Sequence, residues 1–89
     1  MPKALVCINT DFFGAEEVLE ELKTYNEVEE AFRVHGVYDV IAKIKAETTE
    51  SLLDTVTRHI KRQRNVQTVH TMLIFETEES KNEQNALLV

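Results

Sequence analysis

Residues 33–44 read Arg-Val-His-Gly-Val-Tyr-Asp-Val-Ile-Ala-Lys-Ile. Apolar residues recur at alternate positions on both sides of Gly36, which predicts two neighbouring strands joined by a short turn. A link this short requires the two strands to be antiparallel. We expect Gly36 to supply a backbone conformation that other residues resist. The turn then places an aromatic ring and a carboxylate, Tyr38 and Asp39, together at one end of a sheet. That pairing favours recognition of a ligand over bond-breaking chemistry.

Two further strands and two helices are predicted around this hairpin. Apolar residues recur at helical spacing in both helices, and Thr48 and Thr49 offer capping hydroxyls for the second. The predicted order is a strand at 3–10, a helix from Ala15 to Tyr25, strands at 28–35 and 38–46, a helix from Thr48 to Arg64, and a strand at 66–75. This is the order of the ferredoxin-like βαββαβ fold, in the α+β class. Right-handed crossovers place both helices on one face of a four-stranded antiparallel sheet.

Apolar residues occur on both faces of the predicted sheet, although the helices can cover only one. In the first strand Ala4, Val6 and Ile8 alternate with Leu5 and Cys7. We place Val28, Glu30, Phe32 and Val34 on one face of the second strand, and in the last strand Val69, Leu73 and Phe75 on one face and Val66, Met72 and Ile74 on the other. The buried stripe expected of the second helix is Leu52, Leu53, Val56 and Ile60.

The second apolar face predicts association, because burying a Leu or Phe side chain is worth roughly 1.5–3 kcal/mol. Large exposed apolar patches usually mark interfaces. We therefore expect an obligate homodimer, joined sheet against sheet. The alternative is a monomer with a few exposed apolar residues, which is common.

The length, the net charge and the single cysteine limit the classes of protein to which this chain can belong. The 89 residues suffice for one domain with one modest core, which we place at residues 1–78, followed by a polar C-terminal tail at 79–89. A net charge of −6 argues against direct binding of nucleic acid. The single cysteine, Cys7, excludes a disulfide framework within one chain. With no signal-peptide pattern and no run long enough to span a bilayer, we expect a cytoplasmic protein without membrane contact.

Catalysis and metal binding have little support in the sequence. The histidines His35, His59 and His70 lack the spacing of metal ligands. No Ser-His-Asp set, carboxylate pair or phosphate-binding loop stands out. We expect no catalytic residue, no metal and no cofactor. A small dimeric α+β-barrel enzyme remains an alternative, with Asn9 and His35 as its candidate polar groups.

Residues 34–44 resemble the hallmark Val-x-Gly-x-(Tyr/Phe)-Asp, followed by an apolar run, of the effector-binding domain of the Lrp/AsnC transcription regulators, also called the RAM domain. Residues 66–74 resemble the last strand of that domain, and the likeness extends over residues 3–77. It implies a stand-alone sensing domain that lacks the helix-turn-helix of full-length members. It also implies dimers that can assemble into an octamer or another higher ring, with small effectors, typically amino acids, bound between them.

The resemblance and the chemistry of the turn together predict an effector site. Its expected ligand-binding residues are Gly36, Val37, Tyr38, Asp39, His70 and Thr71. Asp39 is expected to bind an amine, and capping of backbone N–H groups is its alternative role. Tyr38 is expected to line the pocket or to pack at the dimer contact. Val69 and His35 depart from the family pattern, which often has a threonine and a small polar residue at these places.

We therefore predict a non-enzymatic domain that senses an amino-acid-like effector between subunits. It is expected to modulate transcription through partner regulators, among them full-length Lrp/AsnC proteins. One alternative is a pure assembly module that forms hetero-oligomers with those regulators. Another is an ACT domain, a different amino-acid-binding ferredoxin-like fold, whose first loop resembles residues 11–14 except that it normally carries proline before the glycine.

Overall fold

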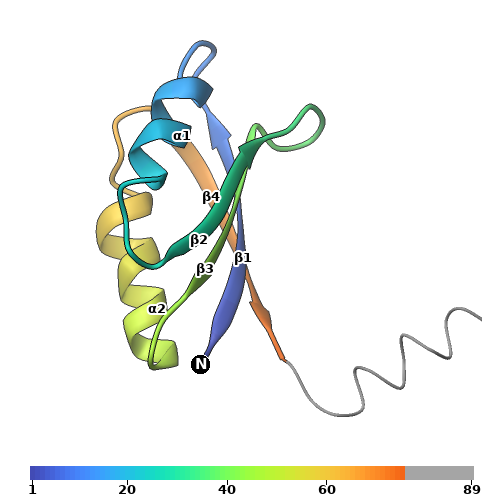
Figure 1. Cartoon of the computed structure of the whole chain (residues 1–89). Coiled ribbons are helices and arrows are strands. Elements are labelled where there is room, and N and C mark those ends of the chain that lie inside the picture. The colour runs from blue at the N-terminus through green and yellow to red at the C-terminus, as the bar shows by residue number, and fades with distance from the viewer. Residues whose placement is uncertain (76–89) are drawn as a thin grey trace, which may run out of the picture.

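One four-stranded antiparallel sheet carries all the helical segments on a single face in the computed structural model, which describes residues 1–75 (Figure 1). The elements are β1 (Lys3–Thr10), α1 (Ala15–Leu22), β2 (Val28–Arg33), β3 (Val40–Lys45), α2 (Thr49–Thr55), a π-helical turn η1 (Val56–Ile60) and β4 (Val66–Ile74). The strand order is β2-β3-β1-β4. This confirms the predicted ferredoxin-like βαββαβ fold, whereas the predicted boundary between residues 78 and 79 lies outside the described residues.

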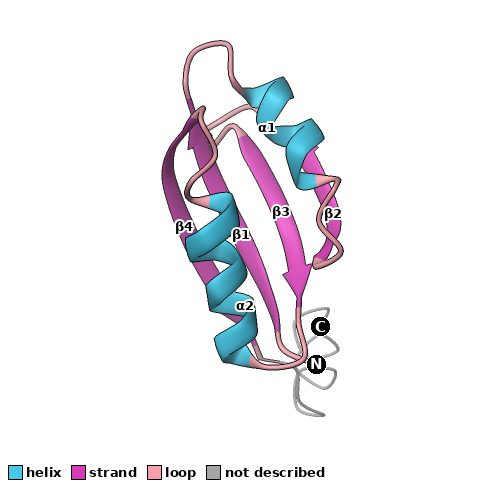
Figure 2. Cartoon of the chain, turned by 90° about the vertical axis from the view of Figure 1, so that its left-hand side faces the viewer, coloured by secondary structure: helices cyan, strands magenta, loops and turns pink. Residues whose placement is uncertain are grey.

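β1 is one of the two central strands of the sheet, and its neighbours β3 and β4 are both antiparallel to it. Val6 lies opposite Ala42 on β3 and Thr71 on β4, so the helix-facing residues of three strands line up. Figure 2 shows α1 and α2 packed across this face, α1 over the β2–β3 side and α2 over the β1–β4 side. Among the described residues, no helix combines the length and the apolar character that a membrane crossing requires.

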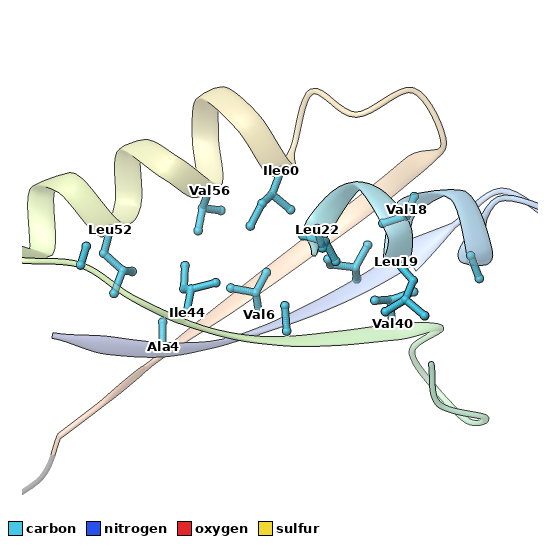
Figure 3. Close-up of a cluster of buried hydrophobic side chains, with 14 residues drawn as sticks. Ala4, Val6, Val18, Leu19, Leu22, Val40, Ile44, Leu52, Val56 and Ile60 are labelled. Carbon is cyan, nitrogen blue, oxygen red and sulfur yellow. The ribbon is translucent and has the colours of Figure 1, made fainter. Parts of the chain in front are cut away.

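The core lies between the sheet and the two helices (Figure 3). On β1, Ala4, Val6 and Ile8 are fully buried, and Leu5 faces the other side. The buried residues of α1 are those spaced at helical intervals: Ala15, Val18, Leu19 and Leu22. The predicted alternation of the first strand and the predicted stripe of the first helix are both confirmed.

The second helix begins as predicted, but one residue of its expected stripe is wrong. The Thr48 side chain accepts a hydrogen bond from the Ser51 backbone N–H at 3.0 Å, which is an N-cap. Leu53 is 42% exposed, whereas Leu52 is fully buried. The two residues are neighbours in the chain, so they lie roughly 100° apart around a helix of 3.6 residues per turn. Thr55 is buried instead of Leu53, and Val56 and Ile60 complete the buried stripe.

Two register shifts move side chains to the face opposite the predicted one. A shift between Val28 and Glu30 turns Val28 toward the core, whereas Phe32 stays 46% exposed on the other face. A second shift, opposite Asn9 and Thr10, turns Val66 toward the core. Strict alternation fails at both places because an irregular pairing offsets the side-chain period of two.

The hairpin turn is longer than predicted. β2 ends at Arg33 and β3 begins at Val40, so residues 34–39 all belong to the turn. No glycine among the described residues has a positive φ, and a Cβ at Gly36 would meet nothing within 4 Å. The expectation that Gly36 supplies a conformation other residues resist is therefore wrong. A turn of this length reverses the chain without a left-handed residue.

Candidate functional site

The face of the sheet away from the helices, here called the open face, carries an apolar cluster. Its side chains come from all four strands: Leu5, Cys7, Phe32, Ile41, Met72 and Ile74. The register also places charged residues on this face: Lys3, Glu30, Lys43 and Lys45. Met72 is 51% and Phe32 46% exposed, whereas Cys7 at the centre is only 3% exposed, and burial raises the pKa of its thiol. In Figure 1 both helices lie to the left of the sheet, and no described element covers its right side. The predicted second apolar face is therefore present.

Tyr38 and His70 form a contact that spans the open face at one end. The Tyr38 hydroxyl lies 3.3 Å from His70 Nδ1, and the two ring centroids are 5.7 Å apart in an edge-on arrangement. His70 stands on β4 opposite Cys7 of β1, so the Tyr38 side chain reaches across β1 from the turn before β3. With Nδ1 unprotonated, the phenol donates to it. The contact holds the turn at residues 34–39 against the sheet.

Asp39 anchors the same turn through three groups. Its backbone N–H donates to the Ile8 carbonyl at 2.9 Å, and its own carbonyl accepts from the Val34 N–H at 3.0 Å. The side-chain Oδ2 accepts from the Thr10 backbone N–H at 2.8 Å and lies 3.5 Å from the Thr10 hydroxyl. Within residues 1–75 these side-chain bonds all fall on Oδ2. Asp39 therefore caps the end of β1, and its Oδ1 remains for another partner.

A second set of hydrogen bonds, through Asn9 and Thr68, supports the turn. Neither residue was predicted to belong to the ligand-binding site. The Asn9 side-chain amide donates to the Val37 carbonyl at 2.7 Å, and the Thr68 hydroxyl donates to Asn9 Oδ1, also at 2.7 Å. Asn9 is the polar residue that follows Leu5 and Cys7 on the open-face side of β1. Asn9 is polar at a position where the alternation of Leu5 and Cys7 predicts an apolar residue, and this signal in the sequence could have identified it.

The structure gathers most, but not all, of the predicted ligand-binding residues. Gly36 and Val37 lie at the exposed tip of the turn, and Val37 is 82% exposed. Tyr38 contacts His70 at its base, and the neighbouring Asp39 bonds Thr10 at the end of β1. Thr71 lies opposite Val6, whose side chain is in the core, so Thr71 faces the helices and is not brought to this cluster. No group of three potential metal ligands occurs within residues 1–75.

Two hollows on the described part of the protomer lie away from the turn. One of about 230 Å³ is lined by α1 and the segment before β4, through Glu17, Val18, Glu21, Gln63, Arg64 and Asn65. Another of about 400 Å³ lies at the end of the sheet where the chain begins. Neither includes a residue of the turn at 34–39. The turn is thus an exposed corner of the protomer that lies outside both of these hollows.

The family model described as the Lrp/AsnC ligand binding domain matches residues 3–83. The chain belongs to the Lrp/AsnC ligand-binding domain family. This match confirms the resemblance found over residues 3–77. It assigns the protein to a class of regulatory ligand-binding domains. A comparison with curated protein sequences found no match.

Several solved structures share the fold closely. The crystal structure of FFRP-DM1 has a TM-score of 0.82 and 32% identity, over 84% of this chain and 100% of that one. The hypothetical protein PHS023 from Pyrococcus horikoshii has a TM-score of 0.81 and 30% identity, over 89% of this chain and 95% of that one. The transcriptional regulator NMB0573 from Neisseria meningitidis, solved with L-Met, has a TM-score of 0.76 and 14% identity, over 86% of this chain and 51% of that one. At that identity the last likeness shows the fold alone.

Proposed function

We propose that this Lrp/AsnC domain is a cytoplasmic sensor that binds a small amino-acid-like effector between subunits and modulates transcription through partner regulators. Family membership supports the class of function. The observation that carries the proposal furthest is the corner formed by Tyr38, Asp39 and His70. It is held by hydrogen bonds from β1 and β4, so its polar groups are positioned before any ligand arrives.

The open face supplies the subunit contact in this proposal. Its apolar side chains are half-exposed at Phe32 and Met72, and a second copy packed sheet against sheet buries them. The Tyr38–His70 contact lies on the same face, so pairing of two copies brings each turn close to the partner subunit. The enclosed cleft that one protomer lacks is then completed by the second copy, or by further dimers in a higher ring.

The chemistry of the turn fits an α-amino acid. The carboxylate of Asp39 keeps Oδ1 for an ammonium group, and the exposed backbone at Gly36 and Val37 offers N–H groups to a carboxylate. The solved Neisseria relative is an L-Met complex, which supports an amino acid as the class of effector. Binding needs no chemical step: an effector that prefers the assembled form stabilises that form by mass action.

Replacing Asp39 separates its two roles. Asp39→Asn keeps an oxygen that can accept from the Thr10 N–H but removes the negative charge, whereas Asp39→Ala removes both. We expect Asp39→Asn to weaken the binding of an amino-acid effector by roughly tenfold or more, which corresponds to about 1.4 kcal/mol. The melting temperature should change little. Asp39→Ala should lose binding equally and also cost about 1–3 kcal/mol of folding stability, because the Thr10 N–H loses its partner.

The measurement is a thermal-shift screen of the wild type against the twenty amino acids, followed by calorimetry of the two variants with any amino acid that binds. An affinity unchanged in Asp39→Asn would show that the ammonium binds elsewhere. Failure of every amino acid to bind the wild type would refute the sensing role and favour the second candidate.

The second candidate is a pure assembly module that forms hetero-oligomers with full-length regulators. One observation favours it: Asp39 and His70 already have partners within the protomer. Co-purification of the chain with a full-length Lrp/AsnC regulator from its own cell extract is the expected result under this candidate. Recovery of self-assembled chain only would exclude it.

A further inference from the structure

Phe12 and Phe13 form an aromatic pair that neither the core nor the open face uses. They lie between β1 and α1, and their side chains are 90% and 89% exposed. The two rings pack edge to face, with centroids 4.6 Å apart and planes at 82°. No other large apolar side chain within residues 1–75 is as exposed. In Figure 1 their loop projects beyond the top of the sheet, at the end opposite the N-terminus.

The loop that carries this pair is held in place. Gly14 N–H donates to the Asp11 carbonyl at 2.9 Å, which closes a turn around the two phenylalanines. The Asp11 N–H donates to the Asn65 carbonyl at 2.8 Å, and the Asp11 carboxylate accepts from the Gln67 amide at 2.9 Å. Rings on a fixed turn lose little conformational freedom when they bind a partner, which favours association.

The hollow of about 230 Å³ between α1 and the segment before β4 adjoins this loop. Asn65 belongs to both features, because it lines the hollow while its carbonyl holds the Asp11 N–H. Glu17 and Glu21 line the hollow from α1, one helical turn apart. The aromatic pair and two carboxylates therefore lie on one continuous stretch of surface.

The two glutamates of the hollow differ from the other two glutamates of α1. Glu16 and Glu20 each lie within 3.7 Å of a basic side chain. Glu17 and Glu21 form no ion pair within residues 1–75, and Glu17 accepts only from the neutral Asn65 amide there, at 2.7 Å. Like charges four residues apart destabilise a helix. A cation placed between these two carboxylates would relieve that repulsion.

One guanidinium does not neutralise the hollow. Arg64 also lines it, but forms no ion pair with either glutamate in the described part of the chain. Two carboxylates against one cation leave an excess of negative charge. The neighbouring Tyr25 phenol responds to it: burial and then the charge of Glu21 raise its pKa, although a hydrogen bond from Gln63 lowers it. With a net charge of −6, this acidity opposes an anionic membrane or a nucleic acid as the partner.

We propose that this surface binds a basic amphipathic segment of a partner protein. A lysine or arginine of the segment enters the hollow between Glu17 and Glu21, and its apolar side chains cover Phe12 and Phe13. Phenylalanine rings also attract cations at their faces. An acidic segment would be repelled, and an uncharged one would leave the two carboxylates without a cation. None of these four residues belongs to the open face or to the turn at 34–39, so the inference goes beyond the proposed sensing role.

The probe is a synthetic helical peptide of leucine and lysine, patterned so that its leucines form one face. Two matched peptides carry glutamate in place of every lysine, or serine in place of every leucine. In calorimetry with the full chain, we expect the leucine–lysine peptide to bind at least roughly tenfold more tightly than either matched peptide. Equal affinity for the serine–lysine peptide would overturn the role of the phenylalanines.

Two double variants test the two parts of the surface. Phe12→Ser/Phe13→Ser removes the rings and keeps the charge. Glu17→Gln/Glu21→Gln removes the charge and keeps an oxygen that can accept from the Asn65 amide. We expect each double variant to weaken binding of the leucine–lysine peptide by roughly tenfold or more. Wild-type affinity in either variant would overturn the proposal.

Each double variant has a matched control. Leu53→Ser removes an apolar side chain that is 42% exposed on α2, and Glu47→Gln/Glu50→Gln removes two exposed carboxylates where α2 begins. Both controls should bind the peptide as the wild type does, and circular dichroism should show all variants folded. An equal loss in both glutamine variants would reveal unspecific attraction to an acidic protein and would overturn the proposal.

Two rival occupants of the aromatic pair give different results. Co-sedimentation with phosphatidylcholine vesicles that depends on Phe12 and Phe13 would assign the pair to a membrane. A lower solution mass of the phenylalanine variant without peptide would show that the rings pack between copies of the chain. Either result would overturn the proposal. None of these outcomes bears on binding of an amino acid at Asp39.

Discussion

Replacing Met72 by glutamate should convert the proposed sheet-to-sheet dimer into monomers. Met72 lies on the open face of β4, opposite Leu5, and is 51% exposed in the protomer. The protomer therefore accommodates glutamate in water, whereas a sheet-to-sheet dimer must bury it. Because Met72 is already about half-buried, the variant loses roughly half of the 1.5–3 kcal/mol that full burial is worth at each copy, and it adds the cost of desolvating an unpaired carboxylate.

The effect is doubled by symmetry, because a two-fold interface contains the substituted residue twice. We expect the dimer dissociation constant to rise by at least roughly a hundredfold, which corresponds to about 2.8 kcal/mol. Light scattering at micromolar concentration should report the dimer mass for the wild type and the mass of one chain for the variant.

The control is Leu53→Glu, which makes the same chemical change at a 42% exposed apolar position on the helix side. It should leave the mass unchanged, and circular dichroism should show both variants folded. If Met72→Glu retains the wild-type mass, the open face is not the subunit contact, and the proposed intersubunit site loses its basis.

The second large effect is expected from the two glycines, which should respond in opposite ways to alanine. A Cβ at Gly14 would lie 2.4 Å from Asn65 Cβ and 2.9 Å from its Cγ. Asn65 cannot easily move away, since its carbonyl accepts from Asp11 N–H and its side chain donates to Glu17 at 2.7 Å. Gly14→Ala should therefore cost about 1–3 kcal/mol of stability, as overpacking does elsewhere.

Gly36 is the matched comparison, because the space around it is open and its φ is not positive. Gly36→Ala should be neutral or stabilise by about 0.4–1 kcal/mol through the unfolded chain. Thermal unfolding measures both, at roughly 4–8 °C per kcal/mol for a chain of this size. Equal melting temperatures for the two variants would contradict the close approach of Gly14 to Asn65.

The sequence analysis placed the structural glycine at the wrong position for a physical reason. Gly36 stands between two alternating runs, where a short turn needs a special conformation, but the actual turn occupies residues 34–39. The constraint at Gly14 comes instead from Asn65, which is distant in the chain. No residue near Gly14 in the sequence indicates its contact with Asn65.

The predicted ligand-binding site shows the same difference between what neighbouring residues reveal and what contacts between distant segments decide. Tyr38 and Asp39 were predicted because they adjoin each other in a recognisable turn, and His70 because of the family resemblance. Their partners Thr10 and Asn9 were missed, since the hydrogen bonds that join them to the turn cross between strands. Thr71 was predicted from the resemblance of the last strand to that of the family, yet it points to the face opposite His70, as adjacent residues of a strand do.

The amino-acid sequence by itself determined the order of the elements, the family, and the alternation of β1, because these follow from periods that are read within one segment. Only the tertiary structure decided where the register shifts at Val28 and opposite Asn9, and which residues lie beside the turn. A side-chain period is a local property of the backbone. Register and cross-strand contacts are settled by packing among segments that are far apart in the chain.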